Sequence, residues 1–289
     1  MANVAGNGIR EFLTTRRARI TPAQAGLRAY GGRRRVKGLR RDEVAMLAGI
    51  SVEYYTQLER GAVGGVSDDV LDAIGRALRL DDVERTHLAD LVHAAKQRPT
   101  RRRRPPAQVR PGVQRVLDAV TDGAAFVRNG RLDVLSANRL GDALYSEAFA
   151  DPERPVNLAR FVFLDPRSRA FYRDWDGIAD AAVGSLRAEA GRDPYGRELT
   201  ELVGRLSVRS DDFRARWATH DVRLYATGEQ RFHHPLVGDL TLGYEALDLV
   251  ADVGLTLVVY AAEPGSPSQD ALRRLAGWGA SRPAPERPG

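Results

Sequence analysis

Two short apolar patterns with helical spacing meet at a glycine corner in residues 39–61, LRRDEVAMLAGISVEYYTQLERG. Gly49 lies where the first helix is expected to end, because glycine adopts a left-handed backbone without steric strain. Ser51 is placed to cap the second helix, which we expect to end at Gly61. The inward faces of the two helices are predicted to comprise Val44, Ala45, Leu47, Ala48, Tyr55 and Leu58.

The second helix of this pair carries mostly polar and aromatic side chains on its outer face. These side chains are Val52, Glu53, Tyr54, Thr56, Gln57 and Arg60. A helix this short gains little stability from packing alone, whereas the major groove of DNA accepts a helix of this kind. The pattern therefore indicates a DNA-binding helical pair, and an ordinary helical hairpin in a bundle is the alternative.

Further helical patterns surround this pair and predict an all-α domain of five helices in residues 9–96. The helices outside the pair are expected at residues 9–19, 68–80 and 81–96. Residues 1–8 show no such pattern and are expected to be disordered. In the connection at residues 23–38, Gly31 and Gly32 precede a run of cations that includes Arg33, Arg34 and Arg35. The run suits an arm that binds phosphates or enters a minor groove, and a solvated basic loop is the alternative.

Residues 97–112, QRPTRRRRPPAQVRPG, follow this domain and carry no acidic residue. A segment with four prolines and six arginines can neither bury much surface nor hold a helix, so we interpret it as an extended linker. It precedes residues 113–276, for which the alternating and helical patterns predict an α+β domain with an antiparallel sheet. The last residues, 277–289, are expected to form a disordered tail.

In this second domain, Asn129-Gly130 is a strong signal for a tight hairpin. The strands are expected at residues 124–128, 132–135, 222–232, 240–249 and 255–262, the last of them central in the sheet. Helices are expected at residues 157–163, 168–175, 178–190, 195–206 and 211–220, with short ones near residues 116–120 and 136–145 and a last one that contains Leu272 and Leu275. The order strand, Asn-Gly turn, strand and helix resembles the start of PAS-type sensor domains.

Length and charge agree with two domains of different character. The chain has 289 residues, enough for about two domains with sizeable cores. Of the net charge of +6, residues 1–110 carry 22 basic against 12 acidic residues, or +10, and the remainder carries 22 against 26, or −4. The first part is therefore suited to a polyanion. There is no cysteine, and no apolar run is long enough for a membrane span or a signal peptide, so we expect a cytoplasmic protein without membrane association.

The corner segment resembles the helix-turn-helix of phage-repressor (Xre-type) regulators. The matching residues are Ala45, Gly49, Ile50, Ser51, Leu58, Glu59 and Gly61. Regulators of this type usually have a phosphate-binding Gln at the start of the first helix, where this chain has Arg41. Arginine also binds phosphate and is charged, so the contact is still expected, with a stronger dependence on salt.

This resemblance implies roles for the outward residues on double-stranded operator DNA. We predict that Val52, Glu53, Tyr54 and Gln57 face base edges; Glu53 would accept from a cytosine amino group and Val52 would contact a thymine methyl. The predicted phosphate-binding residues are Arg33, Arg34, Arg35, Arg41, Thr56 and Arg60. A homodimer on a two-fold operator would place its half-sites about 34 Å apart, or a multiple of that distance.

Longer blocks extend the resemblance over residues 9–276. The blocks include GGRRRVKGLRRDEVAMLAG, VLSANRLGDALYS, NLARFVFLDPRSRAFYRDWD, SDDFRARWATHDVR, HHPLVGDLTLGYEAL and AEPGSPSQDALRRLA. They resemble the actinobacterial MmyB-like regulators, which join an Xre-type helix-turn-helix to a PAS-like ligand-binding domain. The resemblance implies a dimeric one-component transcription regulator that binds a lipophilic small molecule, with fatty acid as the expected ligand class. Ligand binding would then change how two DNA-binding bundles are placed across the Arg-rich linker.

A ligand in a PAS-like domain would bind between the sheet and its covering helices, among apolar side chains with a few polar anchors. The predicted ligand-binding residues are Phe126, Asn138, Arg160, Phe163, Tyr172, Trp175, Tyr225 and Tyr244. Core packing is the alternative role for each aromatic residue. Arg160 is predicted to bind a carboxylate; Asn138 has the competing role of stabilising a helix start, which we favour.

No enzyme signature emerges, so we expect neither catalysis nor a cofactor apart from a bound fatty acid or other lipophilic ligand. The motifs GxGxxG, GxxxxGK[ST] and GxSxG are absent. His233 and His234 are adjacent on a predicted strand and point to opposite faces, so we expect one packed and one solvated histidine rather than a metal site. The main alternative for the second domain is that it binds a protein partner instead of a small molecule.

Overall fold

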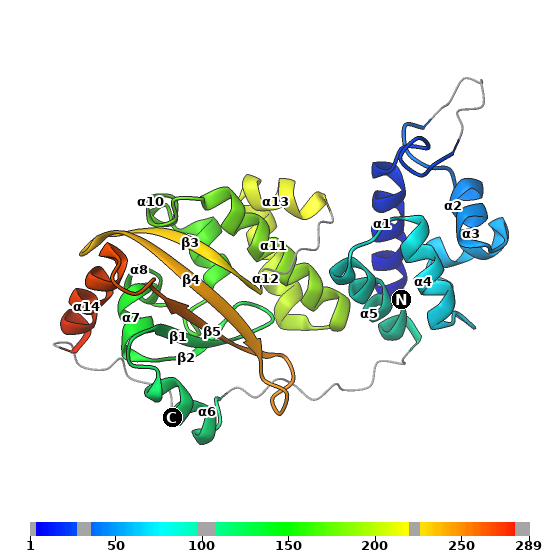
Figure 1. Ribbon diagram of the computed structural model, residues 1–289. Helices are drawn as coiled ribbons and strands as arrows, with labels where there is room; N and C mark the ends of the chain where they lie inside the picture. The colour runs from blue at the N-terminus through cyan, green and yellow to red at the C-terminus, as the bar shows by residue number, and fades with distance from the viewer. Residues whose placement is uncertain (1–3, 28–35, 97–107, 220–225, 281–289) are drawn as a thin grey trace. The chain divides into compact units, whose positions relative to one another are not determined.

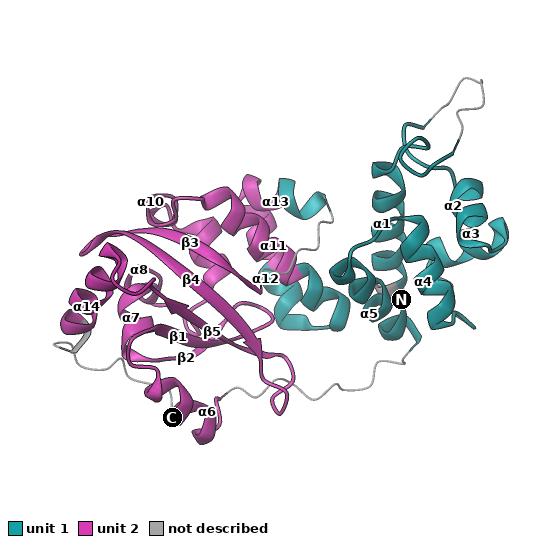
Figure 2. Ribbon diagram, in the orientation of Figure 1, with its two compact units in different colours: residues 1–102, 187–202, 215–223 teal, residues 103–186, 203–214, 224–289 magenta. Residues whose placement is uncertain are grey.

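The computed structural model describes residues 4–27, 36–96, 108–219 and 226–280, which form two compact units (Figures 1 and 2). Unit 1 comprises Met1–Arg102, Arg187–Leu202 and Ala215–Arg223. Unit 2 comprises Arg103–Leu186, Val203–Arg214 and Leu224–Gly289. Unit 1 thus holds more than the predicted helix-turn-helix domain, because two segments from the later part of the chain belong to it.

Five helices from the first part of the chain form most of unit 1: α1 (Val4–Arg19), α2 (Arg41–Ala48), α3 (Val52–Glu59), α4 (Asp68–Ala77) and α5 (Asp82–Lys96). This is the predicted five-helix arrangement. They share one buried core, to which α1 contributes Ile9, Phe12 and Leu13. Burial of apolar side chains at roughly 25 cal/mol per Å² is the main force that holds such a bundle together.

Helix α1 begins earlier than the sequence indicates, so the prediction of disorder is wrong for residues 4–8. The cause is tertiary contact with later segments. A Cβ atom added to Gly61 would lie 2.5 Å from Cα of Gly6, and one added to Gly8 would lie 3.0 Å from a methyl group of Leu91. Local hydrophobic periodicity cannot reveal contacts between residues so far apart in the chain.

Unit 2 contains a five-stranded antiparallel sheet in the order β2-β1-β5-β4-β3. The strands are β1 (Ala124–Asn129), β2 (Val134–Ala137), β3 (Thr227–His234), β4 (Gly238–Asp248) and β5 (Leu255–Ala261). Strand β5 is central, as its nearly continuous run of apolar and β-branched residues predicts. The Asn-Gly signal is likewise confirmed, because β1 and β2 pair as an antiparallel hairpin.

Helices fill the connections of unit 2 and cover the sheet (Figure 1). They are α6 (Pro111–Ala119), α7 (Arg139–Leu144), α8 (Ser146–Phe149), α9 (Leu158–Leu164), α10 (Arg167–Phe171), α14 (Pro267–Ala280) and parts of α11 (Trp175–Arg192), α12 (Arg197–Arg209) and α13 (Asp211–Ala218). On α6, Val113 and Leu117 pack on Val127 and Leu257 of the sheet. Helix α14 packs on α7 and β4, which explains why residues 277–280, predicted as disordered tail, are helical.

Candidate functional site: the helix-turn-helix surface and the aromatic core

The glycine corner has the geometry that its sequence predicts. Gly49 has φ 67° and ψ 32°, in the left-handed region, and ends α2. The Ser51 hydroxyl accepts a hydrogen bond from the backbone N–H of Tyr54 at 3.0 Å and so caps α3. Such a cap contributes about 1 kcal/mol to helix stability. The start of α3 is therefore fixed where its first side chains are expected to meet DNA.

The side chains predicted to read bases lie mostly on the open face of α3. Val52, Glu53 and Gln57 are exposed, while Tyr54 is half-buried and its hydroxyl donates to the carbonyl of Gly65 at 3.5 Å. Among the predicted phosphate contacts on this helix, Arg60 is exposed and Thr56 is half-buried. The inner face contains Tyr55 and Leu58, as predicted. On α2, Leu47 and Met46 are exposed, so the prediction that Leu47 faces inward is wrong.

Arg41 has a partner inside the protein. Its Nε lies 3.0 Å from Oε2 of Glu59, a carboxylate whose side chain is 1% exposed. Arg17 donates to Oε1 of the same carboxylate at 3.0 Å, and the hydroxyl of Thr14 donates to it at 2.8 Å. Burial by itself raises the pKa of Glu59, but the hydrogen bonds from Arg41, Arg17 and Thr14 outweigh it and hold the pKa below its ordinary value. Sequence periodicity does not reveal this buried acid.

The arginines of the predicted arm, Arg33, Arg34 and Arg35, lie outside the described residues, as does Tyr225. Their predicted roles therefore stay predictions. Arg41 remains partly open, with 46% of its side chain exposed, so a phosphate can still approach it while Glu59 orients the guanidinium.

An aromatic cluster fills the interior of unit 2 between the sheet and the helices. Its members are Phe126, Tyr145, Phe161, Phe171, Tyr172, Phe232, Tyr244 and Tyr260, with neighbouring ring centroids 4.9–6.2 Å apart. Three predicted ligand-binding residues, Phe126, Tyr172 and Tyr244, belong to it. The sequence does not indicate that Tyr145, Phe171 and Phe232 belong to the cluster, because their proximity depends on how α7, α10 and β3 meet.

A chain of neutral hydrogen bonds lies within this aromatic cluster. The hydroxyls of Tyr145 and Tyr260 are 2.9 Å apart, and Tyr260 donates to Oε1 of Gln230 at 3.0 Å. Burial raises the pKa of both tyrosines well above the ordinary value, so the hydroxyls stay protonated. We call Tyr145, Tyr260 and Gln230 the tyrosine–glutamine chain. Burial alternates along β3, so Gln230 lies on the inner face of the strand with Phe232 and His234. This alternation is the sequence signal that places Gln230 in the interior.

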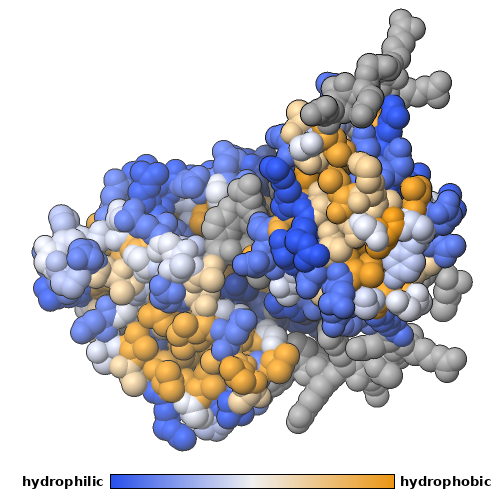
Figure 3. All heavy atoms as spheres, turned by 45° about the vertical axis from the view of Figure 1, so that its right-hand side comes forward, coloured by the Kyte–Doolittle hydropathy of each residue, from blue (hydrophilic) through white to orange (hydrophobic). Residues whose placement is uncertain are grey.

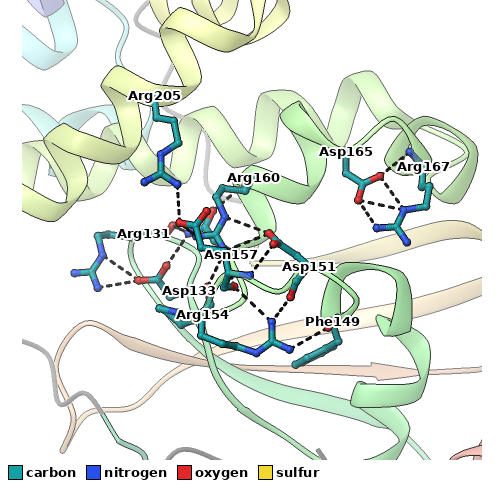
Figure 4. A network of polar contacts seen from close by, with 12 residues as sticks. Arg131, Asp133, Phe149, Asp151, Arg154, Asn157, Arg160, Asp165, Arg167 and Arg205 are labelled. Atoms are coloured by element: carbon teal, nitrogen blue, oxygen red, sulfur yellow. Dashed lines mark hydrogen bonds and ion pairs between the residues drawn. The ribbon is translucent and has the colours of Figure 1, made fainter.

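Arg160, the predicted carboxylate anchor, is already bound by groups of unit 2 (Figure 4). Its guanidinium donates to the carboxylates of Asp151 and Glu153 at 3.1–3.4 Å and to the carbonyls of Glu153 and Pro155 at 2.9 Å. A ligand carboxylate would have to displace one of these acids. Arg160 is therefore not part of the proposed ligand site.

Asn138 has the structural role that the sequence favours. Its Oδ1 accepts from the N–H of Gly141 at 2.7 Å and from that of Ala125 at 3.0 Å. Its Nδ2 donates to the carbonyls of Val120 and Gly123, each at 2.8 Å. The side chain caps α7 and ties it to β1, which uses all of its hydrogen-bonding capacity.

Phe163 and Trp175 belong to a separate group around Phe213. The ring centroid of Phe163 lies 6.0 Å from that of Trp175 and 5.1 Å from that of Phe213. The indole N–H of Trp175 donates to the carbonyl of Val162 and to the Ser168 hydroxyl, each at 3.2 Å. These contacts fix the start of α11.

The two adjacent histidines differ as predicted. His234 is buried and its Nε2 lies 3.1 Å from the carbonyl of Ala143, whereas His233 is exposed beside Asp239 and Arg173. Burial lowers the pKa of His234, so its ring is neutral near neutral pH. Within the described ranges no three His, Cys, Asp or Glu side chains are grouped as a metal site would require.

A capped helix with an open polar face, set at a glycine corner against a second helix, defines a helix-turn-helix protein, and in this chain a second domain with an aromatic core follows. Residues 11–88 match the family described as helix-turn-helix domain, and residues 109–275 match the MmyB-like transcription regulator ligand binding domain. The second match covers more than half of the chain, so the protein belongs to the MmyB-like transcription regulators. A search of curated proteins finds no match. None of the helices in the described part of the chain is long and apolar enough to cross a membrane.

Proposed function

We propose that the protein is a one-component regulator that binds a two-fold operator through α3. The observation that carries this proposal is the exposure of Val52, Glu53 and Gln57 on a helix whose start is capped by Ser51 and whose end is held by Glu59. A recognition helix must be both open and rigidly placed to discriminate bases. Phosphate contacts from Arg41, Arg60 and the arm would set its register without reading sequence.

We assign the proposed small-molecule site to the aromatic cluster of unit 2. The rings offer apolar surface, and the tyrosine–glutamine chain offers neutral donors and acceptors for one polar group. A lipophilic ligand of the fatty-acid type would place its head group at the hydroxyls of Tyr145 and Tyr260, which would exchange their mutual hydrogen bond for one to the ligand. No catalysis enters this proposal, and the absence of cysteine from the sequence supports action in the cytoplasm.

A homodimer is part of the proposal, because a two-fold operator needs two copies of α3. Large apolar side chains exposed on unit 2 include Val250 and Val253 in the β4–β5 turn, at 92% and 84% exposure. Figure 3 shows apolar areas on the molecular surface. Exposed apolar surface of this kind supports self-association. Val250→Asp with Val253→Asp should shift the sedimentation coefficient to that of a monomer, and Val208→Asp, at an equally exposed position of α12, should not.

The test of the DNA-binding proposal is selection from a random duplex library with the full chain. We expect enrichment of one motif with two-fold symmetry. Retention of the whole library without enrichment would show sequence-independent binding and would overturn the proposal for α3.

Native mass spectrometry of the same purified protein tests the ligand proposal. A retained lipophilic molecule, lost on denaturation, supports it. A stoichiometric protein partner in place of a small molecule would instead favour the alternative, in which unit 2 binds a protein.

A further inference from the structure

We infer that the ends of α11 and α13 form a built-in docking segment for the DNA-binding bundle, which links it to the ligand-binding region without depending on residues 97–107. The family match assigns residues 109–275 to ligand binding, yet residues 187–202 and 215–223 belong to unit 1 with the helix-turn-helix (Figure 2). The role of this segment in transmitting a ligand signal rests on the proposed function, whereas its contact with the DNA-binding bundle does not.

An apolar contact carries the first part of this inference. Ala188 of α11 is 7% exposed and belongs to the same buried cluster as Phe12 of α1 and Leu91 of α5. Three residues further along α11, a Cβ atom on Gly191 would lie 2.6 Å from Cε1 and Nδ1 of His87. Backbone and ring therefore approach so closely that a larger residue at position 191 would force them apart.

His87 itself is anchored in the bundle. It is 7% exposed, and its ring meets the ring of Phe12 edge-on with centroids 5.2 Å apart. The α11 end thus contacts α5 at a residue that also contacts α1. A histidine on the free surface of an independently tethered domain would be more exposed than His87 is.

Polar contacts extend the same docking segment to α13 and to the C-terminal end of α1. Arg19 donates to the carbonyl of Thr219 at 2.9 Å. The guanidinium of Arg187 lies 3.8 Å from the centroid of the Trp217 ring and donates to the carbonyl of Trp217. Burial lowers the pKa of Arg187 to about 10, and the carboxylate of Glu11 on α1 acts in the opposite direction. A desolvated guanidinium stacked on tryptophan is a fixed contact rather than a mobile surface charge.

The path from this segment leads to the recognition helix through side chains already described. Helix α1, which receives Ala188, also supplies Thr14 and Arg17 to the buried carboxylate of Glu59 at the end of α3. In the other direction, α11 is one helix of 18 residues, with residues 175–186 in unit 2 and 187–192 in unit 1. A continuous helix transmits displacement because its backbone hydrogen bonds keep it stiff. This route is distinct from the expected one across the Arg-rich linker, which stays a prediction.

A cleavage experiment on the full chain tests the docking. A recognition sequence for a specific protease replaces part of residues 97–107, and the protein is cut and passed over a sizing column at about micromolar concentration. We expect the two fragments to elute together. Separation of the cut fragments, whether the released one is folded or not, overturns the inference, since only the peptide bond would then have joined them.

Substitutions within the docking segment give the second measurement. Gly191→Leu and Ala188→Arg should raise the dissociation constant of the cut fragments by about tenfold to a hundredfold, because overpacking or a buried charge opposes the contact. Val208→Arg, at an exposed position of α12 in unit 2, is the matched control and should leave it unchanged. Equal dissociation constants for all variants would show that the fragments associate elsewhere and would also overturn the inference.

Amide hydrogen exchange tests the signal route separately and needs neither ligand nor operator. Phe171→Leu perturbs the aromatic cluster; we expect faster exchange in α1 and α5 of the uncut protein, and no such effect once Gly191→Leu is also present. Faster exchange in β1 with unchanged exchange in α1 and α5 would overturn the route. Either outcome is independent of the library selection, so failure of the proposed DNA-binding function would be distinguished from failure of this inference.

Discussion

Glu59, the last residue of α3, accepts hydrogen bonds at 3.0 and 3.3 Å from the guanidinium of Arg41, the first residue of α2. The contact joins the two helices at the ends remote from the Gly49 corner. The corner is therefore fixed twice, by backbone geometry at Gly49 and by an ion pair across the two outer ends. A buried carboxylate with several donors favours this arrangement, because a shift of α3 would leave the charge of Glu59 without its hydrogen bonds.

Glu59→Gln should lower the free energy of unfolding by about 2 kcal/mol, because hydrogen bonds to a charged group contribute roughly 1.5–3 kcal/mol and the change leaves Arg17 without its acceptor charge. Urea denaturation measures the loss. Glu53→Gln, which alters an exposed acid of the same helix, is the control and should change stability by less than about 0.5 kcal/mol. Equal stability of the two variants would contradict a structural role for Glu59.

The same variant predicts a dependence on pH. A carboxyl group whose pKa is lowered in the folded state stabilises the fold above its unfolded-state pKa, and that contribution disappears as the pH falls through the folded-state pKa. The stability difference between wild type and Glu59→Gln should therefore be constant near neutral pH and shrink below about pH 4.5, the ordinary value for Glu. A difference that persists at lower pH would point to packing rather than charge as its cause.

The contacts of Glu59 are a part of the site that the sequence does not predict. Gly49, Ser51 and Asn129-Gly130 act through their own backbone or that of near neighbours, so the corner, the cap and the hairpin were predictable. The partners of Glu59 lie up to 45 residues away, and a charged residue is not counted among core positions. The tyrosine–glutamine chain is similar: Tyr145 and Tyr260 are 115 residues apart, and only the fold of the sheet brings them together.

Domain limits illustrate the same point. Composition predicts a linker at residues 97–112, because prolines and arginines change the local character of the chain there, and residues 97–107 of this range lie outside the described ones. The packing of Ala188 and Gly191 in unit 1 could not be predicted, since the periodicity of α11 indicates an apolar face without indicating which partner covers it. Compact unit 2 and the predicted ligand-binding range 113–276 are therefore different sets of residues.

Replacing Arg33, Arg34 and Arg35 together with alanine should flatten the dependence of DNA affinity on salt. Each phosphate contact contributes about 0.9 to the slope of log K against log salt, so three lost contacts reduce it by roughly 2 to 3. Fluorescence anisotropy with one duplex over a range of salt concentrations measures it. Arg209, Arg273 and Arg274, exposed arginines of unit 2, form the control set. An identical slope for the arm variant would mean that the arm is a solvated loop that makes no phosphate contact.

Glu53→Ala should change the base preference at one operator position by about 1–3 kcal/mol and leave the salt slope unaltered, because Glu53 is predicted to contact a base edge and not a phosphate. Library selection with wild type and variant compares the two motifs. Asp72→Ala removes the same charge from an exposed position of α4 and should return the wild-type motif. If selection with Glu53→Ala also returned the wild-type motif, the proposed contact of Glu53 with a base would be contradicted.

In the tyrosine–glutamine chain, Tyr145→Phe and Tyr260→Phe should each lower the free energy of unfolding by about 1–3 kcal/mol. The Tyr260 hydroxyl is hydrogen-bonded to the Tyr145 hydroxyl and to Oε1 of Gln230. The Tyr145 hydroxyl is hydrogen-bonded to Tyr260 and also to the Tyr172 side chain, so either substitution leaves two buried polar groups without that partner. Thermal unfolding of both variants, with Tyr195→Phe at an exposed position as control, measures the loss. Unchanged stability of both variants would contradict the network.

Gly141→Ala and Gly204→Ala make the same chemical change in two helices of the chain and should have opposite signs. At Gly141, in the first turn of α7, the added Cβ would lie 2.4 Å from the carbonyl oxygen of Ala125 and would push the helix off the sheet and off the Asn138 cap. We expect a loss of about 3 kcal/mol from overpacking and broken hydrogen bonds. At Gly204, within α12, nothing lies within 4 Å of the added atom, so alanine should stabilise the helix by about 0.5–1 kcal/mol. Denaturant midpoints of the two variants decide the matter, and a stabilised Gly141→Ala would mean that α7 does not approach β1 as closely as the Asn138 hydrogen bonds require.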